Sequence, residues 1–542
     1  MTLSIDRRLL VKASLLGLAA LAVPGTAAIL AARGFTHGVA SGEPGPRSVL
    51  LWTRHVAAND SRLQCEVATD AAFTRIVGGG SVTARGMADH TAKIVIDGLS
   101  PDTWYHYRFI APDGTKSPAG RTRTLPIGDV ARFGIGLFSC SNMPFGRFNA
   151  YAHAAARDDL DLVVHVGDYI YEYGNDTYPA PGKRMPGREP EPAHEMVTLA
   201  DYRLRHASYR ADPDLLALHQ RFPMIAQWDD HEFANDSWEG GAQNHQPATE
   251  GAWATRKAIA ERVYREWMPV SDRLYDSFQI GTLATLFRPE TRVTGRTKQL
   301  ELAEAIAGRG DLARALVEFR DGPWSAPERT LMGMKQERWL DTELARSVSS
   351  GTRWQVLAQQ LVMGTVRFPV EAEGWIPATA PEAIRRRTLG LAAASRAGLP
   401  LNLDAWDGYP AARSRLLRRA QSTGSNLVVL SGDSHNAWGN NLMEDGRPAG
   451  VEFAGHSVTS PGFEAAIPHI PPADVAKALR ATNPGLLFAD TARRGYVALT
   501  MTPEKVTGEW LFLKDIRTAD TTMAASHSMH VRHGRRAFDG SA

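Results

Sequence analysis

One short apolar run, which ends in an acidic turn, constrains this chain more than any other stretch. Residues 162–166 read LVVHV, the pattern of a β-strand that is buried on both faces. Gly167 lets the backbone turn there, and Asp168 follows at the carboxyl end, where open α/β sheets bind ligands and metals. A turn would bring the Tyr171 phenol to the same centre, as a second hard oxygen donor for a highly charged cation. The plain alternative is a strand end with a solvated aspartate and core tyrosines.

The same arrangement recurs along the chain. Runs 132–138, 222–228 and 426–430 are also apolar and are followed closely by polar side chains, whereas run 353–358 is followed by two glutamines. Strands of one α/β body present their carboxyl ends at a common edge, so we expect the side chains that follow these runs to meet. The residues concerned are Cys140, Asn142, Asp168, Tyr171, Asp229, Asp230, His231, Asp433 and His435.

Acids, a thiol, a phenol and an imidazole in one place need cations to neutralise them. Sulfur, phenolate and imidazole together favour a transition metal such as ferric iron, with zinc as the alternative partner of Cys140. The remaining carboxylates favour a harder ion, namely calcium, magnesium or manganese. The expected metal ligands are Cys140, Asp168, Tyr171, Asp229, Asp230, Asp433 and His435.

Two such cations lower the pKa of a bound water and clamp a phosphoryl group, which predicts hydrolysis of a small phosphate ester by in-line attack of a metal-activated hydroxide. The expected catalytic residues are Asp168, which would bridge two ions, and His231, which would protonate the leaving alkoxide. Asn142 would bond a phosphate oxygen. In the Pro- and Gly-rich loop 179–192, Arg184 and Arg188 would either meet an anionic substrate or simply be solvated.

The amino-terminal residues have the pattern of an export signal. Arg7 and Arg8 precede an apolar run that extends through Val23, and small residues follow up to Ala32. The run from residue 13 to residue 23 is too short to span a membrane, although an anchor helix is the alternative. We therefore expect residues 1–32 to direct export through the twin-arginine translocase to the periplasm or the exterior, with no membrane span left after their removal.

The rest of the chain divides by pattern. Residues 33–126 hold short strand-like runs between turn clusters, which predicts a small β-sandwich of the immunoglobulin or fibronectin type. From 127 to 517 such runs alternate with helical patterns such as 252–268, as in a layered αββα body. Residues 518–542 are expected to form a flexible polar tail.

Composition narrows the range of partners. The 542 residues include 61 basic and 59 acidic side chains, so the formal charge of +2 gives no general attraction to nucleic acid. The chain has only two cysteines, which excludes a disulfide framework. We expect a small phosphate ester as the partner and no nucleic acid.

Several of these motifs occur together in one known family. The chain resembles the PhoD-type alkaline phosphatases, whose members are exported phosphomonoesterases and phosphodiesterases with an N-terminal β-sandwich and a calcineurin-like metallophosphatase body. The motifs that carry the resemblance are Arg7-Arg8, FTHGVASGEP at 35–44, SCSN at 139–142, GDYIYEYG at 167–174, WDDHE at 228–232, NLDAWDGYPAAR at 402–413, SGDSH at 431–435 and ADTARRGY at 489–496.

The resemblance implies one ferric and two calcium ions. The residues that resemble the family's iron ligands are Cys140, Asp168, Tyr171 and His435, and those that resemble its calcium side are Asp168, Asp229, Asp230 and Asp433. Two departures stand out. Asn175 replaces an expected phosphate-binding arginine, which would move that role to Arg184 or Arg188, and residues 287–292 read FRPETR where LDTR is expected. The rival functions are a phosphodiesterase or phospholipase D on the same site and a non-catalytic exported binding protein.

Overall fold

The computed structural model describes residues 26–540 of the chain. The predicted export signal, residues 1–32, lies outside the described residues except for its last part, where helix α2 (Thr26–Ala31) begins. Across residues 26–540, no helix combines the length and the apolar character needed to cross a bilayer.

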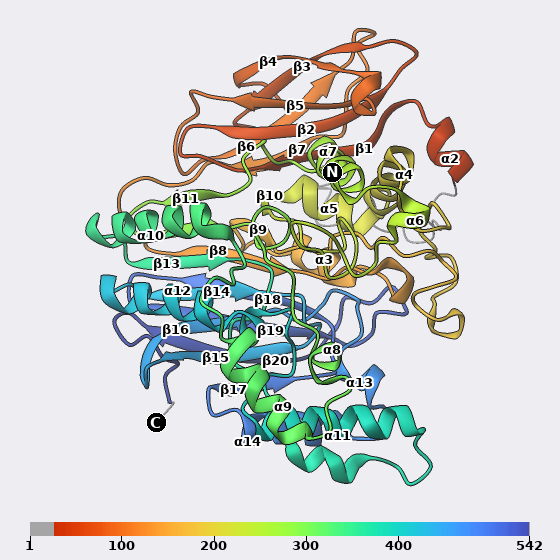
Figure 1. The fold of residues 1–542 in the computed structure, drawn as a ribbon. Helices are drawn as coiled ribbons and strands as arrows, with labels where there is room; N and C mark the ends of the chain where they lie inside the picture. The colour runs from red at the N-terminus through yellow and green to blue at the C-terminus, as the bar shows by residue number, and fades with distance from the viewer. Residues whose placement is uncertain (1–25, 541–542) are drawn as a thin grey trace, which may run out of the picture.

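Two large sheets form the body (Figure 1). The nine-stranded sheet has the order β20-β19-β18-β8-β9-β10-β1-β2-β5, and β8, β9, β10 and β1 are parallel neighbours. Its strands are β1 (Gly34–Gly42), β2 (Val49–Val56), β5 (Thr91–Ile96), β8 (Phe133–Phe138), β9 (Leu162–His165), β10 (Pro223–Ala226), β18 (Gly495–Met501), β19 (Lys505–Leu513) and β20 (Met523–Arg532).

The seven-stranded sheet has the order β11-β12-β13-β14-β16-β15-β17, with β12, β13, β14 and β16 parallel. Its strands are β11 (Asp276–Ile280), β12 (Ala284–Arg288), β13 (Trp354–Ala358), β14 (Leu427–Ser431), β15 (Ala437–Glu444), β16 (Arg447–Ala454) and β17 (Leu486–Asp490). Strands β8, β9, β10, β13 and β14 are buried along their whole length, which explains the unbroken apolar runs.

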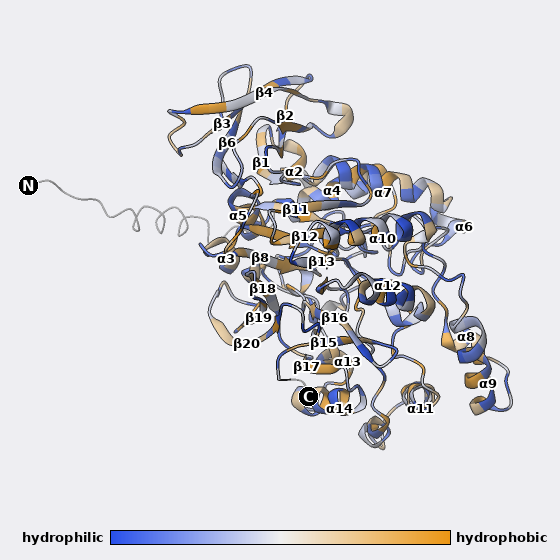
Figure 2. Cartoon of the chain, turned by 90° about the vertical axis from the view of Figure 1, so that its left-hand side faces the viewer, coloured by the Kyte–Doolittle hydropathy of each residue, from blue (hydrophilic) through white to orange (hydrophobic). Residues whose placement is uncertain are grey.

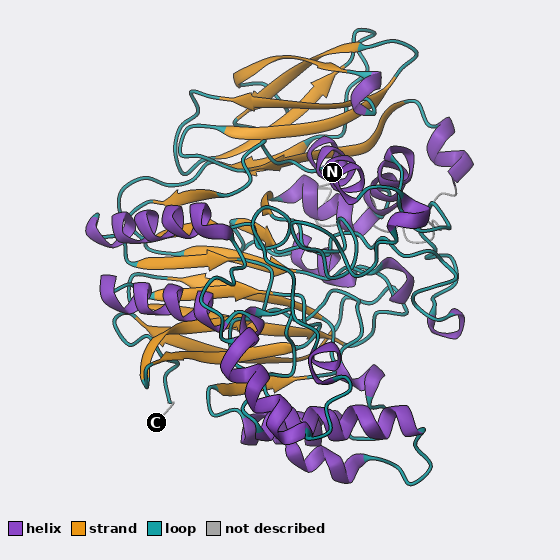
Figure 3. Ribbon diagram, viewed as in Figure 1, coloured by secondary structure: helices purple, strands orange, loops and turns teal. Residues whose placement is uncertain are grey.

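The two sheets pack face to face and helices cover their outer faces (Figure 3). Leu137 and Val164 of one sheet share a core with Val356 and Leu430 of the other. Outside the nine-stranded sheet pack α3 (Asn149–Ala155), α4 (Leu199–Arg210), α5 (Pro213–Arg221) and α7 (Trp253–Trp267). Outside the seven-stranded sheet pack α10 (Gly333–Ser349) and α12 (Pro410–Thr423). The expected αββα layering is confirmed.

The remaining helices lie towards the periphery, and α8, α9 and α11 project from the body in Figure 2. They are α6 (Pro247–Glu250), α8 (Leu302–Ile306), α9 (Leu312–Phe319), α11 (Glu382–Arg396), α13 (Phe463–Ala466) and α14 (Pro472–Thr482). A small apolar core of their own, which includes Leu316, Phe319 and Leu399, holds α8, α9 and α11 together.

The N-terminal all-β part is present as expected, but it is not a closed unit. Its second sheet, β4-β3-β6-β7, packs on β1, β2 and β5 through a core that includes Leu51, Leu63 and Tyr107. Because β1 also pairs with β10, three strands of the sandwich continue the nine-stranded sheet of the body. The strands of the second sheet are β3 (Ser61–Ala68), β4 (Ile76–Ala84), β6 (Trp104–Ile110) and β7 (Gly120–Arg123).

The prediction of a flexible tail over residues 518–542 is wrong for most of that segment. Strand β20 pairs with β19 from Met523 to Arg532, and its Val531 is buried in the core between the sheets. The His527 ring stacks on Phe488 at 3.9 Å between centroids. The tail therefore forms an edge strand whose outer face is polar.

Candidate metal centre

Sharp backbone turns place the side chains that follow β8, β9 and β14. Cys140, Asp168, Asp433 and His435 all have φ between 54° and 60°, a left-handed conformation that costs energy in residues with a side chain. Gly167 allows the β9 turn to touch the next strand end, since a Cβ on it would lie 2.3 Å from the Cβ of Asp229. Local strain of this kind concentrates at functional sites, where the surrounding fold holds it in place.

The structure brings the predicted ligands together. Three overlapping groups of possible ligands are present, and within each group the ligand atoms lie within 4.8 Å of one another. Asp168 and Asp230 each belong to two of the groups. The Tyr171 hydroxyl donates to Asp168 at 2.9 Å and lies 3.3 Å from His435 Nε2. We call this set the strand-end cluster: Cys140, Asp168, Tyr171, Asp229, Asp230, His231, Asp433 and His435.

Two unused carboxylate oxygens suit a cation. Asp168 Oδ1 and Asp229 Oδ2 are buried and have no hydrogen-bond partner among the described residues. Burial raises the pKa of Asp168 well above its usual value, and the neighbouring Asp230 and Asp229 raise it further while His231 opposes them. Burial and the Asp168 charge likewise raise the pKa of Cys140 and Tyr171. Asp168, Cys140 and Tyr171 therefore ionise together only when further positive charge is brought in, so these donors fit metal ions.

Glu232 joins two of the strand-end turns, although the sequence pattern gave it no role. Its carboxylate accepts hydrogen bonds from the backbone N–H groups of Asp168 (3.1 Å), Tyr169 (2.6 Å) and Asp229 (2.7 Å). The side chain is 1% exposed. It therefore fixes the relative position of the β9 and β10 turns.

Arg292 is the second residue that the motifs did not identify. Its fully buried guanidinium donates to Asp229, to Asp404 (2.5 Å) and to Asp433 (3.0 Å). It bonds Oδ1 of Asp229 and leaves Oδ2 free. Segment 287–292, which departs from the family motif, begins at the end of β12 and thus ends at the cluster. There Arg292 supplies a fixed positive charge.

His231 is held by a buried acid. Its Nδ1 lies 2.7 Å from Oε2 of Glu172, which is 0% exposed, and its ring packs 4.2 Å from that of Tyr171. Burial lowers the pKa of His231, but Asp168, Asp230 and Glu172 outweigh it and raise the pKa well above the usual value. The imidazole is therefore held in one orientation within the cluster and has a proton available.

The residues expected to bind phosphate differ in whether they still have hydrogen-bonding atoms to offer. Asn142 is 1% exposed, and neither atom of its amide has a partner among the described residues. Arg188 is neither solvated nor free, because it is buried and paired with Asp212. Arg184 donates to the Pro179 carbonyl at 2.9 Å, and its Nη2 is buried without a partner in the described chain.

Arg494 is a further cation beside the cluster. It pairs with Glu464, and it contributes with His231 to the low pKa of His435, which burial above all lowers to about 3. Asn175, by contrast, bonds the Pro190 carbonyl within its own loop.

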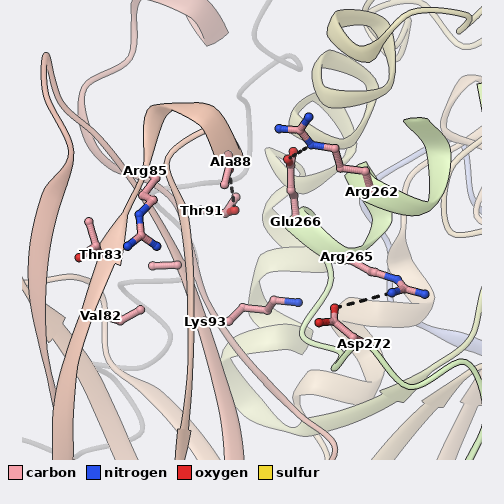
Figure 4. A pocket seen from close by; sticks show the side chains of 11 residues that line it. Val82, Thr83, Arg85, Ala88, Thr91, Lys93, Arg262, Arg265, Glu266 and Asp272 are labelled. Carbon is pink, nitrogen blue, oxygen red and sulfur yellow. Dashed lines mark hydrogen bonds and ion pairs between the residues drawn. The ribbon is translucent and has the colours of Figure 1, made fainter. Parts of the chain in front are cut away.

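A separate hollow of about 430 Å³ lies between the N-terminal part and α7 (Figure 4). Lys93, Arg262 and Arg265 line it, and Lys93 Nζ donates to the Val270 carbonyl at 2.6 Å. None of its lining residues in the described chain belongs to the strand-end cluster.

Comparison with known proteins agrees with this arrangement. Residues 133–510 match the family model of the PhoD-like phosphatase, and residues 21–126 match that of the PhoD-like phosphatase N-terminal domain. Alkaline phosphatase D of Bacillus subtilis (strain 168) is 34% identical over 498 residues, which span 87% of this chain and 76% of that protein. A solved structure of PhoD aligns over 94% of this chain and 92% of its own, with 30% identity and a TM-score of 0.74.

Fold, site and relatives together define a phosphoric ester hydrolase with a metallophosphatase-like body. Within that class the chain belongs to the PhoD-like phosphatase family. The alternative of a non-catalytic binding protein has no support from these findings.

Proposed function

We propose that the protein is an exported, metal-dependent phosphatase that hydrolyses small phosphate esters at the strand-end cluster. The observation that carries the proposal is the pair of buried, unpartnered oxygens on Asp168 and Asp229 within overlapping groups of acids, thiol and imidazole. When bound, the ions would supply an activated water and neutralise the charge of the phosphoryl group.

The ligands divide by chemistry. Ferric iron would be held by the softer and phenolic donors, Cys140, Tyr171 and His435, together with Asp168. Calcium would be held by the carboxylates Asp168, Asp229, Asp230 and Asp433, with zinc, manganese or magnesium as substitutes. Arg292 would orient Asp229 by bonding its Oδ1, and Glu232 would orient the same residue by accepting from its backbone N–H group.

His231 would act as the general acid, since Glu172 orients its ring and raises its pKa. Asn142 would donate to a phosphate oxygen. Arg184 would use its Nη2, which has no partner among the described residues, to bond the phosphate, and Arg494, whose charge acts on His435, is the alternative. We further propose that residues 1–32 direct twin-arginine export to the periplasm or the exterior, that 33–126 shape substrate access and that 127–517 hold the catalytic centre.

The test compares Asp168→Asn with Asp158→Asn, whose parent side chain is 89% exposed. Protein purified without chelator is assayed for metal content and for hydrolysis of p-nitrophenyl phosphate. We expect Asp168→Asn to lose metal and at least about a thousandfold in turnover, and Asp158→Asn to lose neither. An Asp168→Asn protein that retains iron and near-full activity would refute the proposal. Tyr171→Phe should abolish a phenolate–ferric absorption band.

One observation favours diesters, which are the substrates of the rival phosphodiesterase or phospholipase D. Tyr178 lies between Tyr173 and Phe145, with ring centroids 5.0 and 5.4 Å away. Burial raises the pKa of Tyr178 to about 12, and the charge of Asp168 adds to this, so the rings adjoin the cluster. Such an aromatic wall would suit the second ester arm. Faster hydrolysis of bis-p-nitrophenyl phosphate than of p-nitrophenyl phosphate would make the diesterase the better assignment.

A further inference from the structure

Five arginines in the described chain have fully buried side chains: Arg205, Arg210, Arg256, Arg292 and Arg296. Four of them have partners. Arg205 donates to main-chain carbonyls, while the other three donate to carboxylates. This is the ordinary requirement, because a charge taken out of water needs hydrogen bonds and an opposite charge.

Arg210 is the exception. Its Nε, Nη1 and Nη2 are all buried and make no hydrogen bond of standard geometry with a described residue, although the Tyr169 hydroxyl lies close enough to interact with the guanidinium. Arg210 also forms none of the ion pairs found among the described residues. Its guanidinium carbon lies 4.3 Å from the centre of the Trp52 ring. A cation–π contact recovers part of the cost of burial, but it satisfies no N–H group and brings no negative charge.

The rings around Arg210 supply no counter-ion either. His206 lies one turn earlier on the same face of α4, and its ring stacks against that of Tyr169. The Tyr169 hydroxyl in turn lies 2.9 Å from His219 Nε2. Burial lowers the pKa of His206 to about 3 and that of His219 well below its usual value, and Arg210 lowers both further. A tyrosine hydroxyl such as that of Tyr169 is neutral near pH 7. These neighbours are therefore neutral, and Nδ1 of each imidazole has no hydrogen-bond partner within residues 26–540.

The two acids whose charge reaches Tyr169 are already used. Glu232 accepts hydrogen bonds from three backbone N–H groups of the strand-end turns. Asp212 pairs with Arg188 and also caps α5 by accepting from the N–H groups of Asp214 and Leu215. Arg188 is a matched case, because it is also buried and also lies over an aromatic ring, 4.7 Å from the centre of Phe148. The difference between the two arginines is the counter-ion.

We propose that a small monovalent anion of the halide class is enclosed at the Arg210 guanidinium, between α4, Trp52 of β2 and Tyr169. One negative charge balances the single guanidinium. The donors of Arg210 are N–H groups, which suit an acceptor that has no protons of its own. Arg210, Trp52 and His219 are each 0% exposed, which excludes a hydrated dianion such as phosphate. Water would satisfy the hydrogen bonds but leave the charge uncompensated. This site is separate from the proposed phosphatase centre and does not depend on it.

The experiment follows thermal unfolding of the full metal-loaded protein in sodium chloride, bromide or gluconate at constant ionic strength. A ligand that binds only the folded state raises the midpoint with its concentration. We expect chloride and bromide, but not gluconate, to raise the wild-type midpoint. Arg210→Met should abolish that halide response, whereas Arg188→Met should lower the midpoint and keep the response.

Crystals grown in bromide give an independent readout that needs no variant, should Arg210→Met fail to fold. We expect an anomalous peak within hydrogen-bonding distance of the Arg210 nitrogens. The proposal is overturned if ordered water alone occupies that position, or if the wild-type midpoint is the same in chloride and gluconate.

Discussion

At the residue scale, the pair of Glu172 and His231 offers a direct test of acid catalysis. Glu172→Gln keeps the shape of the side chain but removes the charge that orients His231 and raises its pKa. We expect turnover to fall by about tenfold to a hundredfold on alkyl phosphates and less on p-nitrophenyl phosphate, whose leaving group needs little protonation. In a His231→Asn background the same change should add little, because the two residues act as one unit. Equal losses on both substrates would argue against the acid role.

A second residue, His456, links stability to pH away from the metal centre. It is fully buried, its Nε2 lies 3.1 Å from the Leu511 carbonyl, and burial lowers its pKa from 6.5 to about 3. Between these two pH values the unfolded chain binds a proton that the folded chain does not, so stability falls as the pH drops below 6.5, by about 1.4 kcal/mol per pH unit for this one group.

His456→Gln removes that dependence, and urea unfolding at pH 7.5, 6 and 5 should show a shallower loss of stability than in the wild type. An identical slope in His456→Gln and wild type would contradict the assignment.

The strand-end pattern located most of the cluster because a buried strand and the polar residues after it are adjacent in sequence. It could not assign a role to Glu232, because this side chain accepts hydrogen bonds from three backbone N–H groups that come together only in the folded protein. Asp404 likewise follows none of the apolar runs, and its hydrogen bond from Arg292 links it to the cluster. Neither role expected for Arg188 is found, because it pairs with Asp212. The loop sequence could not indicate this partner, since Asp212 is the N-cap of α5.

At the element scale, β20 shows why a polar edge strand escapes detection. Its residues alternate between half-buried and exposed, and Val531 is its one fully buried position, so apolar periodicity is weak. Strand β6 (Trp104–Ile110), in contrast, alternates strictly between half-buried and buried residues, so its period of two is visible in the sequence.

The pairing of β20 makes a testable claim about Val531. Val531→Asp would place a carboxylate in the core between the sheets, opposite Val506, and should lower the free energy of unfolding by about 3 kcal/mol or more. Ser528→Asp, at an exposed position of the same strand, should change it by no more than about 0.5 kcal/mol. Equal stabilities by urea unfolding would mean that the segment is a tail after all.

At the scale of the whole molecule, the junction of β1 with β10 determines whether the N-terminal part is an independent unit. Ser41 and Gly42 pair in parallel with Pro223 and Met224, which continues the sheet across the boundary between the two parts. Trp52 Nε1 reinforces it by donating to the Glu266 carbonyl at 2.8 Å. Parts that share one sheet and one buried interface should unfold together.

We therefore expect a single calorimetric transition, with equal calorimetric and van't Hoff enthalpies, rather than one transition for each part. Gly42 is the sensitive point, because a Cβ on it would lie 2.0 Å from the Pro269 carbonyl oxygen and 2.9 Å from that of Met224. Gly42→Ala should thus lower stability by about 2 kcal/mol or more, whereas Gly310→Ala, where a Cβ meets nothing within 4 Å, should not. Two separate transitions in the wild type would show that the parallel pairing transmits no cooperativity, and the N-terminal part would then count as a domain of its own.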